Sequence, residues 1–182
     1  MSRFVVLAIA LASSLALAPA PVGAHARQVD FQPRRGARTL LFFDAMFGVD
    51  GAFVGDEHPV DGIPGDELPW EIDAVVGRLD TAGNLFLLIK GLVFKDDPSV
   101  PEDLRGINDE EEFRAAVACL TEEGGQVVQR NVVTSGFPAT RSGNSVIHAH
   151  VDLPDPCIAP AVLVLAGSED KWFSVTGFET ED

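Results

Sequence analysis

From residue 40 onward, short apolar segments alternate with turn sequences, and this spacing restricts the fold more than any other feature. The segments are rich in Val, Leu, Ile and Phe, and the stretches between them contain Gly, Pro, Asp and Asn. Short apolar segments between such turns are typical of strands, whereas a helix needs a longer apolar repeat. The pattern therefore predicts an all-β domain, an antiparallel sandwich of about eight strands, immunoglobulin-like or jelly-roll-like.

Three hairpins are predicted where a turn sequence joins two strands: at DTAGN, at the Gly pair 124–125 and at GSEDK. Before the first of these turns, Trp70, Ile72, Ala74 and Val76 are predicted to share one face of a strand. The predicted strands are Leu40–Val49, Trp70–Leu79, Leu85–Phe94, a strand from about Phe113, Val127–Thr134, Ser145–Leu153, Ala161–Ala166 and Trp172–Phe178.

One segment fits both periodicities. FRAAVACL places apolar residues at helical as well as strand spacing, and Asn108 with Glu111 fits a capping box. Because the Gly pair at 124–125 favours a hairpin, we predict a strand here, preceded by one helical turn at 108–112.

The N-terminal segment has the composition of a secretory signal peptide. Arg3 precedes the apolar run VVLAIALASSLALA, and Ala24-His25-Ala26 provides a small-residue cleavage site. We predict a signal peptide at 1–26, a flexible basic arm at 27–39 and a single β-sandwich domain at 40–182. A retained membrane anchor is the alternative. Since no second run is long enough to cross a bilayer, the mature chain is expected to be secreted, extracellular or periplasmic, without membrane insertion.

The charge balance is strongly acidic and argues against polyanionic partners. The formal net charge is −15, and loss of Arg3 with the signal peptide changes it to −16. Such a chain repels phosphate backbones, so we do not expect it to bind nucleic acid. The expected partner is an unknown protein or a small ligand, and the expected state is a monomer.

Two cysteines, Cys119 and Cys157, remain after cleavage. Export places them in an oxidising compartment, and no CxxC spacing indicates a redox site. We predict one disulfide between them. In the chain-entropy model, closing a loop of this length stabilises the fold by roughly 3–4 kcal/mol.

The stretch VIHAHVDL contains the one pattern that suggests a metal site. In a strand, His148 and His150 share a face and lie roughly 6.6–6.8 Å apart, so both rings can converge on one ion. His58 is the third histidine of the mature chain, and it can join them only if the loop at 50–69 folds over the strand. Zinc or copper is the implied cofactor. The alternative is that both histidines are ordinary polar residues on the solvent face of the strand.

Other candidate sites are weaker. The loop GDEHPVDGIPGDEL offers five carboxylates to calcium but lacks an EF-hand pattern, so surface acids are the simpler interpretation. Trp70 and Trp172 can bind a ligand or pack in the core. GxSxG, HExxH, P-loop and GxGxxG motifs are all missing, which argues against catalysis. Loop 135–144 is a possible inhibitor loop.

The segments PW, GLVF, FRAAVACL, FPAT, LPDPC and WFSVTGF resemble those of small exported bacterial β-domain proteins of unassigned function. The resemblance covers most of residues 40–178 and implies a compact secreted β domain. We therefore expect a non-catalytic domain that acts by binding or as a structural surface protein. The alternative is a metal-binding protein or metalloenzyme with a His-x-His strand site.

Overall fold

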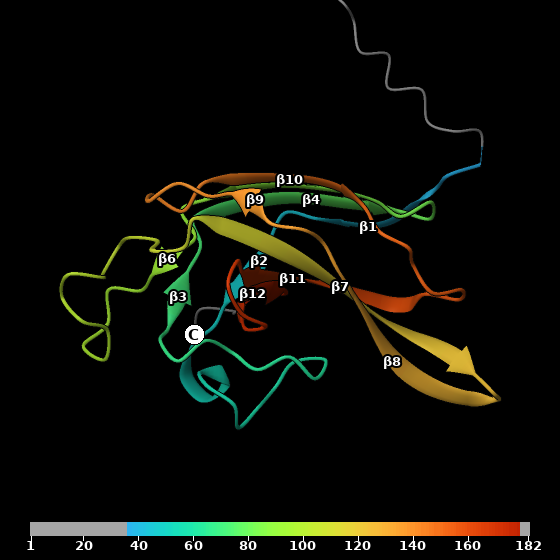
Figure 1. The fold of residues 1–182 in the computed structure, drawn as a ribbon, viewed down its shortest axis with the longest axis horizontal. Coiled ribbons are helices and arrows are strands. Elements are labelled where there is room, and N and C mark those ends of the chain that lie inside the picture. Colours follow the sequence, from blue (N-terminus) through green and yellow to red (C-terminus); the bar gives the residue numbers. More distant parts are fainter. Residues whose placement is uncertain (1–35, 179–182) are drawn as a thin grey trace, which may run out of the picture. The chain divides into compact units, whose positions relative to one another are not determined.

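The computed structural model describes residues 36–178, and they fold almost entirely into antiparallel strands (Figure 1). The all-β prediction is confirmed. The predicted signal peptide and most of the predicted arm lie outside the described residues. The one helix of the described part is the 3-10 turn η1, Gly51–Phe53, so this part contains no helix that could cross a membrane. The strands are β1 Thr39–Phe43, β2 Met46–Gly48, β3 Trp70–Glu71, β4 Ala74–Asp80, β5 Asn84–Lys90, β6 Val93–Phe94, β7 Glu112–Glu123, β8 Gln126–Val133, β9 Phe137–Pro138, β10 Ser145–His150, β11 Ile158–Ala166 and β12 Trp172–Thr176.

Two main sheets form the domain. Sheet A has the strand order β1-β4-β5-β10, and sheet B has the order β2-β12-β11-β7-β8, with β9 also paired to β7. A two-stranded pair, β3-β6, lies at one end of the layers, and the β7–β8 hairpin extends beyond them at the other end (Figure 1). The hairpins β4–β5, β7–β8 and β11–β12 occur at the three predicted turns.

A single apolar core joins the two sheets. Along β4 and β5 every second side chain is buried, which is the alternation expected when one face of a sheet packs and the other faces water. Gly77 lies on the packed face because a Cβ there would stand 2.0 Å from the ring of Phe43. The aromatic ring of β1 thus fills the space that a side chain on β4 would need.

Sheet B is covered on both faces at its centre. Val162–Ala166 of β11 are all buried, and Trp172 and Phe173 of β12 point to opposite faces. Phe173 stacks on Trp70 with ring centroids 3.9 Å apart, whereas Trp172 lies 6.3 Å from the ring of Phe53 in η1. The segment at 50–69 therefore covers one face of this sheet. Two backbone hydrogen bonds attach this segment to β12. Trp172 N donates to Pro64 O, and Asp66 N donates to Trp172 O.

Three predicted strands are divided in the structure. Leu40–Val49 breaks after Phe43, and its halves β1 and β2 belong to different sheets. Leu85–Phe94 breaks at Gly91, whose φ of 63° is unsuited to a strand. The predicted strand from Trp70 breaks before Ala74. That break reverses the alternation, so Trp70 is buried while Ala74 and Val76 are exposed, and the predicted common face is wrong.

The predicted helical turn at 108–112 is also wrong. Strand β7 begins at Glu112, close to the predicted start, and the residues before it are irregular. The Asn108 side chain bonds to the carbonyl groups of Glu110 and Thr140 and accepts from Glu110 N. Its amide joins two loops instead of capping a helix.

The predicted disulfide is present. Cys119 on β7 is bonded to Cys157, which precedes β11, with a Cα–Cα distance of 5.1 Å. It connects two neighbouring strands of sheet B across a sequence separation of 38 residues.

Candidate functional site

His148 and His150 both lie on the solvent face of β10, as the strand alternation predicts. Ile147, between Val146 and His148, is fully buried, and both histidines are exposed. The His148 ring meets the Phe86 ring edge-on, with centroids 6.4 Å apart. The Nε2 atom of His150 lies 3.9 Å from an Asp152 carboxylate oxygen. The two rings are accessible to a ligand from solvent.

The structure places His58 away from this pair. His58 lies in the segment that covers sheet B, and its Nδ1 atom is 2.9 Å from the carbonyl oxygen of Ala52. In Figure 1 this segment and β10 are on opposite sides of the domain. Among residues 36–178, the groups of three potential ligands within 4.8 Å of one another do not include a histidine. A three-histidine site is therefore not assembled in this conformation.

The surface around His148 is broader than the His-x-His motif. It consists of the outward-pointing side chains of β1, β4, β5 and β10, which we call the outer face of sheet A. Cross-strand pairing arranges these side chains in rows. The first row contains Phe42, Arg78, Phe86 and His148. The second contains Val76, Leu88 and Val146. Ala74 and Lys90 lie beyond the second row, and Asn84 and His150 lie on the other side of the first.

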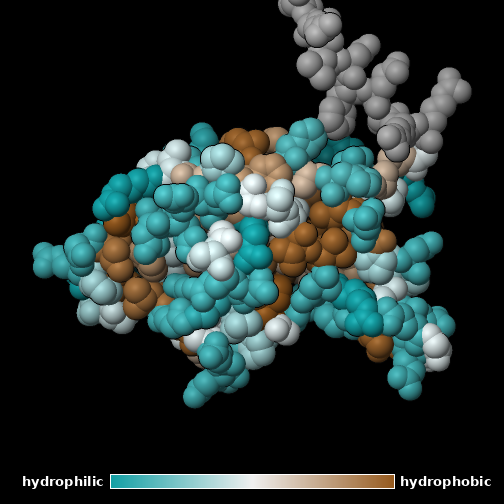
Figure 2. All heavy atoms as spheres, viewed as in Figure 1, coloured by the Kyte–Doolittle hydropathy of each residue, from teal (hydrophilic) through white to brown (hydrophobic). Residues whose placement is uncertain are grey.

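Several apolar side chains are exposed on this face, where a solvated sheet face usually carries polar residues. Phe42 is 63% exposed, Val146 is 52% exposed and Phe86 is 41% exposed, and Val76 is exposed beside them. Seen edge-on in Figure 2, apolar residues lie among hydrophilic ones along the top of the molecule, where sheet A runs. Single exposed apolar residues are ordinary, but a contiguous group of them on one face indicates an interaction surface.

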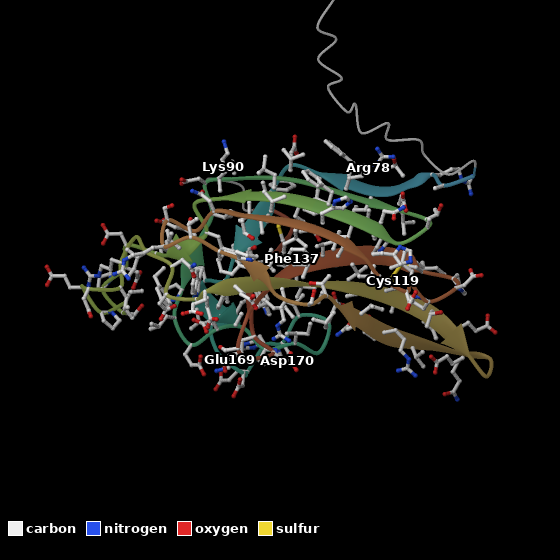
Figure 3. All side chains as sticks on the ribbon, turned by 45° about the horizontal axis from the view of Figure 1, so that its top comes forward. Arg78, Lys90, Cys119, Phe137, Glu169 and Asp170 are labelled. Carbon is white, nitrogen blue, oxygen red and sulfur yellow. A yellow bond between two sulfur atoms is a disulfide. The ribbon has the colours of Figure 1, made fainter. Side chains whose placement is uncertain are left out.

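Two cations lie on the outer face. Arg78 and Lys90 project from it, away from sheet B, with Lys90 nearer one end of the sheet and Arg78 nearer the other (Figure 3). Among the outward positions of the four described strands, Asp80 is the one carboxylate. It accepts hydrogen bonds from the backbone N–H groups of Ala82 and Asn84 and from the Asn84 side chain.

These hydrogen bonds determine the protonation of Asp80. Desolvation raises the pKa of the carboxyl, but the bonds from the Asn84 side chain and from the two backbone amides outweigh it. The net pKa of Asp80 is held below its ordinary value of 3.8. Both oxygens of Asp80 accept hydrogen bonds in the turn at 80–84, and the charge of Arg78 further lowers the pKa of this carboxyl without an ion pair within 4.0 Å.

Basic residues in the rest of the domain are mostly ion-paired. Arg114 pairs with Asp170, with 3.1 Å between nitrogen and oxygen, on the side of the domain opposite sheet A (Figure 3). Similar ion pairs involve Lys95 with Asp50, Arg105 with Asp96, Arg130 with Glu123, and Lys171 with Glu67 and Glu169. Within the described part of the chain, Arg78 and Lys90 have no carboxylate within 4.0 Å. Among the nine basic residues of the described part, Arg38 and Arg141 likewise form no ion pair, and Arg78 interacts with Asp80 through its charge, which lowers the pKa of that carboxyl.

A shallow depression borders the outer face at Lys90. It lies between β5, β10 and β9, has a volume of about 530 Å³, and is lined by Leu88, Lys90, Pro138, Asn144 and Val146 among others. Its walls are apolar apart from the Asn144 side chain, which bonds to Gly91 N and Ser142 Oγ, and Ser145, which donates to Pro138 O. The Lys90 ammonium group is therefore the charged group at this depression.

The acidic loop does not form an open cation site. Asp66, Glu67 and Glu169 bring carboxylate oxygens within 4.8 Å of one another. However, Asp66 accepts a 2.8 Å hydrogen bond from Trp70 Nε1, and Lys171 pairs with both Glu67 and Glu169. Burial raises the pKa of Asp66 above its ordinary value of 3.8, against the lowering effects of Trp70, Leu68 and Lys171. The cluster already contains its own cation.

The remaining sequence candidates have structural roles. Trp70 and Trp172 are both buried, so neither offers a binding surface. Residues 140–144 form a closed turn, with Gly143 N bonded to Thr140 O and Asn108 N bonded to Arg141 O. An inhibitor that is bound by strand addition presents an extended segment instead.

Comparison with known proteins gave no match: neither a family model, nor a curated protein, nor a solved structure is similar to this chain. The site is therefore defined by its own geometry alone.

Sequence analysis found the histidines but missed the rest of the outer face. A signal for this face is present in the sequence, since LFLLIK places apolar residues on both faces of its strand. That signal could not be separated from a strand buried on both faces without knowing which layers pack together.

Proposed function

We propose that this chain is an exported, non-catalytic domain that binds a partner through the outer face of sheet A. The observation that supports this most is a contrast within one fold. In the rest of the domain, apolar faces pack against each other and most cations form ion pairs. On the outer face of sheet A, Phe42 and Phe86 are exposed, and Arg78 and Lys90 form no ion pair. Exposed aromatic and arginine side chains are the residue types that contribute most to protein interfaces.

Export is supported by two features of different kinds. The N-terminal sequence has the features of a signal peptide, and the folded domain contains the Cys119–Cys157 disulfide. Disulfides persist in oxidising compartments, and those lie outside the cytosol.

Photo-crosslinking from defined positions tests the binding surface. A benzophenone amino acid would replace Val146 on the outer face or, as a control, Val127 on the β7–β8 hairpin, where the side chain is also exposed. In the producing cells, we expect one discrete adduct from position 146, lost when Phe86→Ser is introduced, and none from position 127. Equal adducts from both positions, or none from position 146, would contradict the proposal.

A metal-binding function at His148 and His150 is the second candidate. Both rings are exposed on one strand face, and Asp152 lies next to His150. Titration with zinc or copper should then give one-to-one binding that is lost in a His148→Ala/His150→Ala variant. Binding that is no tighter than that of this variant would leave the two histidines as polar residues of the outer face.

A further inference from the structure

We infer that the partner presents a carboxylate-bearing protein segment with an apolar centre, bound across the outer face of sheet A between Arg78 and Lys90. This inference rests on the proposed function and specifies the chemistry of the partner. Arg78 and Lys90 lie two cross-strand rows apart on the face, and the aliphatic side chains of Val76, Leu88 and Val146 form the row between them. A complementary surface therefore has acids outside and apolar groups between them.

The sheet geometry sets the spacing of those acids. Lys90 on β5 lies opposite Ala74, which is four residues from Arg78 along β4. With a rise of about 3.3 Å per residue and about 4.8 Å between strands, the two Cα atoms are roughly 14 Å apart. In an extended segment, side chains at positions i and i+4 point the same way and are separated by about 13 Å. Acids at i and i+4, with an apolar residue at i+2, thus match the two cations and the aliphatic row between them.

The size and charge of the face argue against a second copy of this chain as the partner. Four strands about 4.8 Å apart, with seven residues at about 3.3 Å each, give a face of roughly 400 Å². A stable protein interface needs about 800 Å² per partner. A symmetric pairing of two such faces would also bring together cations that have no acidic partner on the face. A single segment requires a smaller area and supplies the missing carboxylates.

We place one end of the partner segment in the depression beside Lys90. Leu88, Val146 and Pro138 provide apolar surface beside Lys90, and Leu88 and Val146 also belong to the second row of the face. We therefore place one carboxylate at Lys90 and the apolar centre over Val76 and Leu88, which lie between Lys90 and Arg78.

An NMR titration with defined peptides tests this inference. The probe is the peptide SETFTES, with Glu at i and i+4 and Phe between them, and the matched control is SQTFTQS. We expect amide shifts of β4, β5 and β10 to move with SETFTES and a weaker effect with SQTFTQS. Arg78→Gln and Lys90→Gln should each weaken binding by roughly two- to fivefold. Arg130→Gln removes the same charge from the β7–β8 hairpin, where it pairs with Glu123, and should leave binding unchanged.

The outcomes separate this inference from the proposed function. If position 146 gives a discrete crosslink but SETFTES binds no better than SQTFTQS up to millimolar concentration, the face binds a partner of another chemistry and this inference is wrong. If neither experiment detects an occupant, the proposed function fails as well. Binding to phosphatidylglycerol vesicles that depends on Arg78 and Lys90, without peptide binding, would identify an anionic membrane and also overturn the inference.

Discussion

The outer surfaces of both sheets carry aromatic side chains, and only that of sheet B is covered. On sheet B, Trp172 is fully buried because Phe53 and the segment at 50–69 lie over it. On sheet A, Phe42 and Phe86 point to solvent beside the cations Arg78 and Lys90.

The two surfaces differ in whether another segment of the chain covers them. The covering segment is bound to β12 by backbone hydrogen bonds, and the charges around it are mutually satisfied by Lys171, Glu67 and Glu169. The outer face of sheet A has neither a covering segment within residues 36–178 nor carboxylates paired with its cations. Residues of similar type therefore stabilise the fold on one sheet and remain exposed on the other.

The largest expected effect comes from removing the covered aromatic residue. Trp172→Ala should lower the free energy of unfolding by about 3–5 kcal/mol, because a large buried ring leaves a cavity that the sheet cannot close. Denaturant unfolding followed by circular dichroism measures this loss. A loss below about 1 kcal/mol would show that the segment at 50–69 does not pack as described.

A second substitution disturbs the covering segment itself. A Cβ at Gly65 would stand 2.0 Å from the carbonyl oxygen of Phe53 and 2.7 Å from a methyl group of Val49. Gly65→Ala should therefore cost about 1–3 kcal/mol through overpacking. Gly55→Ala is not a suitable control, because the φ of Gly55 is 84°. Ser135→Ala on an exposed loop serves instead, and it should unfold at the same denaturant concentration as the wild type.

Protonation of Asp66 should also affect the covered region. Because burial raises its folded-state pKa above 3.8, the folded state binds a proton more readily than the unfolded state. The unfavourable contribution of the charged group is absent at pH below the unfolded pKa and develops as pH rises through the folded pKa. Relative to Asp66→Asn, which keeps an acceptor for Trp70 Nε1, the wild type should lose stability as pH rises above the unfolded value of 3.8 and through the raised folded-state pKa. A pH-independent difference between the two proteins would contradict this assignment.

The smallest effect on stability is expected on the outer face. Phe86→Ser removes a side chain that is 41% exposed, so it should change the free energy of unfolding by less than about 1 kcal/mol. Thermal unfolding would measure this, and the same variant should lose the crosslink from position 146. A loss as large as that of Trp172→Ala would mean that Phe86 serves the fold and not a partner.

Much of the fold could be predicted from local patterns. Turn sequences located the three hairpins, and the alternation in Ser145–Leu153 correctly placed His148 and His150 outside and Ile147 inside. The disulfide between Cys119 and Cys157 was predicted correctly, because these are the two cysteines of a chain expected to be exported. The hairpins and the alternation depend on residues close together in the sequence. The disulfide could be predicted because two cysteines allow one pairing.

The remaining features depend on contacts distant in sequence. Nothing local shows that β1 and β2 belong to different sheets, because one exposed turn at Asp44 interrupts an otherwise continuous apolar run. The acidic segment at 50–69 looked like a solvated loop, yet Phe53 and Gly65 make it a cover for β12. The outer face of sheet A could not be recognised for the same reason: its exposure follows from which sheet that segment covers.

Oxidative footprinting of two matched phenylalanines tests the central claim most directly. Phe53 and Phe86 are both 41% exposed, one in the covering segment and the other on the outer face of sheet A. Hydroxyl-radical labelling would be compared between the purified protein and the protein in its native surroundings. We predict that Phe86 is protected in the native surroundings while Phe53 reacts equally in both. Equal reactivity of Phe86 in both conditions would contradict the assignment of the outer face as the binding surface.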